Sequence, residues 1–108
     1  MLSVRDTMRV ERDGETAATV KKKLFTPFRD TYEAKLADGR ELKIHGDFTD
    51  HEFDIEDGGR RIARVSRKWF SIRDTYAIEV ADDQDVPLLL CVAVCVDVLN
   101  AEERKHHD

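Results

Sequence analysis

The segment from Val86 to Val96 is apolar on every side of a helix, and this feature restricts the fold more than any other in the sequence. A helix that lies on a sheet needs only one apolar stripe, so a helix that is apolar all round is expected to be buried on all sides. The segment is too short to cross a bilayer, which needs about 20 apolar residues. We therefore expect a helix over about residues 86–104 that is threaded through a closed sheet.

Polar residues mark the start and the interior of this helix. Asp85 is a typical N-cap residue, and Pro87 fits the first turn. Asp97 interrupts the apolar run, and a carboxylate buried without a partner would cost several kcal/mol. We expect Asp97 to lie at the mouth of the barrel or to pair with an arginine or with backbone amides, where it would fix the register of the helix.

Cys91 and Cys95 lie four residues apart within the apolar run, on one face of a helix and with poor geometry for a mutual disulfide. We expect both to be small, reduced core residues. Two such cysteines give no sign of a disulfide framework, and Met1–Val10 lacks the apolar stretch of a signal peptide. These features predict a cytoplasmic protein.

The residues before the helix read as short strands separated by turn signals. Asp13-Gly14, Asp38-Gly39 and Asp57-Gly58-Gly59 are hairpin signals, because Asp-Gly tolerates the positive φ of tight turns. No connection is long enough for a parallel crossover, so the pairing should be antiparallel. The predicted strands are Leu2–Glu11, Ala17–Phe25, Thr31–Leu36, Leu42–Gly46, His51–Glu56, Arg61–Phe70 and Thr75–Val80.

One strand-turn-strand unit recurs along the chain. Val65–Tyr76 is similar to Val20–Tyr32, and Ser3–Met8 is a partial third copy. Such repetition predicts a sheet built from one type of hairpin. Each copy holds an Arg-Asp-Thr triplet, which we interpret as a turn in which the Asp binds local backbone amides.

The composition indicates one soluble globular domain over residues 1–108, because 41% of the residues are hydrophobic and 38% are charged. The net charge is −5. Residues 1–81 hold 16 basic and 16 acidic side chains, and residues 82–108 hold 2 and 7. The basic surplus usual in duplex-binding domains is missing, so we expect no nucleic acid partner.

The segments Val65–Tyr76, Gly46–Phe48 and His51–Ile55, followed by an acidic turn and the segment from Leu88 to Asp97, resemble the LURP-one-related family. That family belongs with the Tubby C-terminal-like and phospholipid scramblase proteins. The resemblance covers Leu2 to Leu99, and its most specific part is the stretch Ser66–Phe70. It implies a mainly β fold, an antiparallel Tubby-like barrel wrapped around a hydrophobic C-terminal helix.

The resemblance also raises a question of closure. Family members usually carry additional hairpins before the point where this chain begins, and seven strands would not close a barrel of about twelve. The chain is therefore a fragment, or forms a smaller barrel, or is completed by a second copy. Unpaired edges beside an apolar helix favour association, so a homodimer is expected.

Basic side chains supply the candidate ligand site. A strand face that meets an anionic partner, with phospholipid headgroups implied by the Tubby-like relatives, would make the protein a peripheral membrane binder that does not cross the bilayer. Trp69 and Phe70 beside this run suit an interfacial anchor, although adjacent strand residues point oppositely. The alternative is a structural or protein-interaction domain in which the charges only solubilise. The candidate residues are Lys21, Lys22, Lys23, Arg64, Arg67 and Lys68.

An enzymatic alternative rests on a cluster of imidazoles and carboxylates. Zinc and manganese take such ligands, but the residues alternate faces across a turn, so an exposed polar turn is expected and no metal or cofactor is predicted. His106-His107-Asp108 is a similar cluster near the terminus. No Gly-flanked nucleophile or phosphate loop is present in the sequence, and we expect no enzyme. The cluster is His45, Asp47, Asp50, His51 and Asp54, and the serines considered are Ser3, Ser66 and Ser71.

Overall fold

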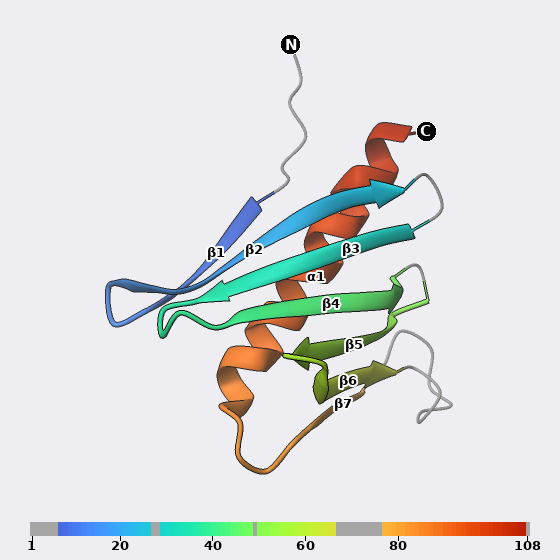
Figure 1. The fold of residues 1–108 in the computed structure, drawn as a ribbon. Helices are drawn as coiled ribbons and strands as arrows, with labels where there is room; N and C mark the ends of the chain where they lie inside the picture. Colours follow the sequence, from blue (N-terminus) through green and yellow to red (C-terminus); the bar gives the residue numbers. More distant parts are fainter. Residues whose placement is uncertain (1–6, 27–28, 49, 67–76, 108) are drawn as a thin grey trace.

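A computed structural model describes residues 7–26, 29–48, 50–66 and 77–107. Seven strands precede one helix (Figure 1). The elements are β1 (Thr7–Arg12), β2 (Glu15–Thr26), β3 (Arg29–Leu36), β4 (Glu41–Asp47), β5 (Glu52–Asp57), β6 (Arg60–Ser66), β7 (Ala77–Val80) and α1 (Val86–His107).

The strands form one sheet in the order β1-β2-β3-β4-β5-β6-β7, and each strand is antiparallel to the next. The antiparallel prediction is therefore confirmed. The β1–β2 turn shows the local cause, since Asp13 and Gly14 both adopt positive φ, 53° and 82°. These angles suit the type of tight turn whose twist matches that of the strands it joins.

The sheet curls around one side of α1 to form a half-barrel (Figure 1). Register shifts interrupt the β1–β2, β2–β3 and β5–β6 pairs, and such bulges bend strands and increase their twist. Strands β1 and β7 stand at the two ends of the strand order and are not paired with each other. The predicted mainly β fold with a C-terminal helix is confirmed, and the sheet is open.

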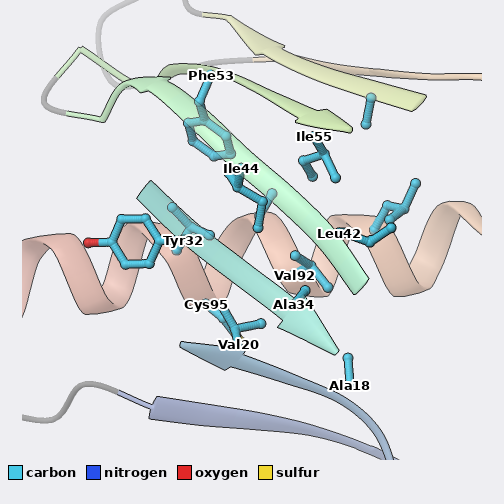
Figure 2. Close-up of a cluster of buried hydrophobic side chains, with 14 of the residues drawn as sticks. Ala18, Val20, Tyr32, Ala34, Leu42, Ile44, Phe53, Ile55, Val92 and Cys95 are labelled. Atoms are coloured by element: carbon cyan, nitrogen blue, oxygen red, sulfur yellow. The ribbon is translucent and has the colours of Figure 1, made fainter. Parts of the chain in front are cut away.

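The core lies between the concave face of the sheet and α1. Alternate strand residues such as Tyr32, Ile44 and Ile55 point at the helix, where they meet Val92 and Cys95 (Figure 2). Each large apolar side chain that is fully buried contributes about 1.5–3 kcal/mol. The other buried apolar residues of the described part of the helix are Leu88, Leu89, Ala93, Val96 and Leu99.

The start of α1 follows the prediction. Asp85 accepts a hydrogen bond at Oδ1 from the backbone N–H of Leu88, at 3.2 Å. Pro87 lies in the first turn. An N-cap of this type stabilises a helix by about 1 kcal/mol relative to alanine.

The prediction that α1 is buried on all sides is wrong for the described part of the chain. Val86, Leu90 and Val94 are 49%, 44% and 46% exposed. Cys95 is buried as expected, but Cys91 is exposed, and both are free thiols. The reason is the open sheet, which covers only one side of the helix.

The prediction that the Arg-Asp-Thr triplets are turns is wrong for Arg29-Asp30-Thr31, which begins β3. Strand β2 continues to Thr26 and so provides a pairing partner for the triplet, with Leu24 opposite Asp30. The triplets at 5–7 and 73–75 lie partly and wholly outside the described residues, respectively, and the predicted strand ends at 2–6, 67–70 and 75–76 lie outside them too.

Candidate functional site

Opposite charges alternate across the convex face of the sheet, which we call the outer face. Antiparallel register places Lys21 opposite Glu33, Glu33 opposite Lys43, and Lys43 opposite Glu56, which in turn faces Arg61. Opposite charges at directly paired positions stabilise a sheet by about 0.2–1 kcal/mol each. Much of the basic charge on the outer face is therefore matched by carboxylates on neighbouring strands.

The predicted anion-binding residues differ in their surroundings. Lys23 forms an ion pair with Glu33 at 2.9 Å, and Arg64 approaches Asp54 at 3.5 Å. Lys21 is exposed on the same outer face. Arg67 and Lys68, with Trp69 and Phe70, lie outside the described residues.

Lys22 points the other way, and the expectation that it shares an outer face with Lys21 and Lys23 is wrong. It pairs in register with Tyr32, which is 1% exposed and belongs to the core. The Lys22 Nζ atom is buried. Strand alternation explains the difference, because successive side chains point to opposite faces of a sheet.

The residues of the imidazole and carboxylate cluster, for which no metal was predicted, take different partners. His45 Nε2 lies 2.8 Å from Glu56 Oε2. Asp47 accepts a hydrogen bond from the backbone N–H of Asp50 at 3.2 Å. His51 and Asp54 contact residues elsewhere, on α1 and β6 respectively. Within the described ranges, no group of three His, Cys, Asp or Glu side chains is placed to hold a metal ion.

His51 connects the β4–β5 loop to α1. Its Nδ1 lies 2.9 Å from Asp97 Oδ1, and the two side chains are 28% and 14% exposed. The backbone of His51 has a φ of 55°, and its N–H donates to the carbonyl oxygen of Phe48. Asp97 is thus paired, as expected for a buried carboxylate, but its partner is a histidine and not an arginine or a backbone amide.

Three arginines near one end of the sheet hold the segment that leads into α1. Arg12, at the end of β1, makes two hydrogen bonds to Asp85, at 2.8 and 3.3 Å. Arg60 at the start of β6 binds Asp83 in the same two-point manner, at 3.0 and 3.1 Å. Arg40, before β4, donates to Gln84 and Asp57.

These arginine pairs were not predicted, and they have electrostatic consequences. The hydrogen bond from Arg60 lowers the pKa of Asp83 to about 2, and Gln84 adds to the effect. Arg12, followed by the backbone of Leu88, lowers the pKa of Asp85. A meander places alternate hairpin turns at the same end of a sheet, and that topology is the signal that locates Arg12, Arg40 and Arg60 together.

The uncovered side of α1 carries a row of apolar residues at intervals of four, which we call the apolar stripe: Val86, Leu90 and Val94. The helix approaches β1, β2 and β7, and the stripe is on the side of the helix that stays exposed. Exposed apolar surface of this kind often marks an interaction site.

The candidate serines and the C-terminal His-His-Asp cluster remain to be placed. Ser66 is buried and donates a hydrogen bond to Glu52 at 3.1 Å. Ser3 and Ser71 lie outside the described residues, and so do the side chains of His106, His107 and Asp108. Among the described helical residues, none forms a segment long and apolar enough to span a bilayer.

The curled antiparallel sheet and the C-terminal helix in its concave side define a module that fits the Tubby-like barrel class. Residues 1–97 match the LURP-one-related family, and the chain belongs to that family. It is 33% identical over 61 residues to the uncharacterized protein YxjI of Bacillus subtilis (strain 168). The match covers 56% of this chain and 38% of that relative, so the chain spans well under half of the relative's length. No solved structure matches the chain.

Proposed function

We propose that this chain is a non-enzymatic, cytoplasmic binding module that attaches peripherally to anionic phospholipid headgroups. The observation that supports the proposal is the segment from Arg60 to Arg73, which holds six basic residues and no acid. Arg61 and Arg64, at the start of this segment, line a hollow on the surface beside β7. Basic residues near an anionic membrane surface each contribute about 1 kcal/mol of attraction.

The charge pattern narrows the proposed site. Lys23 is paired with Glu33, and Lys22 has its ammonium group buried on the concave side. Two acids, Glu79 and Asp82, also line the hollow beside β7. Arg64 also lies near an acid, Asp54, at 3.5 Å, so the proposal rests on the acid-free run that Arg64 shares with Arg67 and Lys68 more than on residues 21–23.

Vesicle co-sedimentation tests this proposal. The protein is mixed with phosphatidylcholine vesicles that contain or lack phosphatidylserine, and the bound fraction is measured at several salt concentrations. Binding should require the anionic lipid and weaken as salt rises, because the Debye length falls from about 10 Å at 0.1 M to about 3 Å at 1 M. Absent or salt-insensitive binding contradicts the proposal.

A matched pair of variants locates the site. The triple variant Arg64→Gln, Arg67→Gln, Lys68→Gln should bind anionic vesicles about 100-fold more weakly, since three lost charges remove about 3 kcal/mol. The control replaces Arg9, Lys35 and Lys43 by Gln, which changes the net charge equally at exposed positions outside the candidate set, and should retain binding. An equal loss in both variants would mean that net charge alone governs the attraction.

Two further ligands separate related chemistries. Soluble phosphoserine at matched ionic strength should compete with vesicles only weakly, because it offers one headgroup and no surface. A short DNA duplex should not bind, in line with the lack of a basic surplus. Elemental analysis after removal of loosely bound ions tests the non-enzymatic part, since stoichiometric zinc or manganese would favour the metal alternative.

The second candidate function is protein interaction, and the apolar stripe of α1 favours it. Solvent-exposed apolar residues on a helix that is otherwise the core of the protein are surface that a partner can cover. This candidate requires no lipid, so its tests are made in vesicle-free solution.

A further inference from the structure

Strand β1 has one paired edge and one edge that faces away from the sheet. Its partner is β2, and within the described ranges no strand lies on its other side. Such an edge presents backbone N–H and C=O groups that can pair with another strand. Met8 and Val10 point inward and are packed against the core, whereas Arg9 and Glu11 are exposed on the outer face.

The outward side chains of β1 are complementary to themselves. If two β1 strands pair antiparallel about a two-fold axis at Val10, Arg9 of each copy lies opposite Glu11 of the other. Neither side chain has an ion-pair partner among the described residues of its own chain, so the pairing would satisfy both charges twice. The two Val10 side chains would meet at the axis on the concave side.

The same axis brings the helices together. A two-fold axis perpendicular to the joined sheet keeps both concave faces, and therefore both α1 helices, on one side. Helix α1 lies against β1, and the sheet curls around it (Figure 1). A strand added beyond β1 therefore continues the curl toward the apolar stripe, where Leu90 and Val94 are about half exposed in the single chain.

We propose that two copies of this chain form a symmetric dimer through antiparallel β1–β1 pairing centred on Val10, which joins the two half-barrels and covers the apolar stripes of both helices. This inference supplies a partner for the protein-interaction candidate. It does not depend on headgroup binding, because no lipid takes part.

Sedimentation velocity without lipid tests the dimer. The wild-type chain at about 100 μM, above the Kd of a weak dimer, should sediment as a species of twice the 12.5 kDa chain mass and dissociate on dilution. Arg9→Glu places like charges opposite each other twice, so the dimer Kd should rise at least 10-fold, by about 1.4 kcal/mol or more.

A charge exchange separates this interface from effects on folding. The double variant Arg9→Glu, Glu11→Arg restores both cross-strand pairs and should return the Kd to near the wild-type value. Lys35→Glu, the same charge change on the outer face of β3, should leave the Kd unchanged, and Leu90→Glu should weaken the dimer. Circular dichroism checks that each variant remains folded.

Three outcomes would overturn the proposal. The first is a wild-type chain that stays monomeric at the highest concentration, which would leave the stripe to a different polypeptide. The second is a dimer that Arg9→Glu does not weaken or that the double variant does not restore. The third is a series of larger species, which would indicate open-ended association through another edge. None of these outcomes would contradict the proposed vesicle binding, because a monomer could also bind vesicles.

Discussion

The two sides of α1 are built from the same kind of residue and have different surroundings. Leu89 is 2% exposed and lies in the core, while its neighbour Leu90 is 44% exposed. The apolar composition of a helix therefore indicates that its surface favours burial, but it does not indicate which element or chain covers that surface. The sheet covers one side of the helix, and the apolar stripe on the other side is about half exposed.

The largest expected effect comes from the covered side. Leu89→Ala should lower the free energy of unfolding by about 3 kcal/mol, through lost burial and the cavity left behind. Leu90→Ala, the same chemical change one residue away, should cost less than about 0.5 kcal/mol when measured on the monomer. Urea unfolding at low protein concentration measures both values.

Repeating the two measurements at higher protein concentration tests whether a second copy covers the apolar stripe. If a second copy covers the stripe, the loss of unfolding free energy caused by Leu90→Ala should grow with protein concentration. The loss caused by Leu89→Ala should stay the same at all concentrations. Equal costs for the two variants at high dilution would show that the sides of α1 do not differ as described.

A smaller effect concerns the polar contact on the covered side. Asp97→Ala removes the acceptor for His51 and should cost about 1–2 kcal/mol. Asp97→Asn keeps an oxygen that can accept the hydrogen bond and should cost less than the alanine variant. Thermal unfolding compares them, and a cost for asparagine as large as that for alanine would argue against the hydrogen bond as the cause.

The smallest effect concerns the arginine pairs before α1 and appears at acid pH. The pKa of Asp83 is lowered from 3.8 to about 2, and that of Asp85 is lowered too. Their contribution to stability is complete above the unfolded-state pKa and is lost as pH falls from about 4 to about 2. The double variant Asp83→Asn, Asp85→Asn keeps an N-cap residue and should show a smaller fall in melting temperature over this range.

Asp82→Asn is the control for this acid effect. It removes one carboxylate from the same loop, against two in the double variant, without disturbing the pairs that Arg12 and Arg60 make with Asp85 and Asp83, so its pH profile should follow that of the parent. A profile like that of the double variant would trace the effect to general charge repulsion.

Much of the fold was predictable because its signals are local. Asp13-Gly14 requires a tight turn, and the alternation of Phe53 and Ile55 with acids defines the inner face of β5. The orientation of Lys22 was also within reach, since it continues the inward series Ala18 and Val20. Because successive strand residues point to opposite faces, Lys21, Lys22 and Lys23 cannot all belong to one surface.

The cover of α1 and the partner of Asp97 were not predictable in the same way. Apolar residues around the whole helix, Leu90 included, call for burial whichever chain provides it, so the open sheet could not be inferred from them. The contact between His51 and Asp97 joins residues 46 positions apart. It depends on how the helix lies across the sheet, which no local pattern specifies.

The strand order has a consequence for how the molecule assembles. Every strand pairs with its neighbour along the chain, so the sheet is made of short-range contacts that form quickly, one hairpin after another. The helix that fills the concave face comes after all seven strands in the chain. During synthesis the strands therefore emerge before the helix that covers their apolar inner face. While that face is exposed, aggregation can compete with folding.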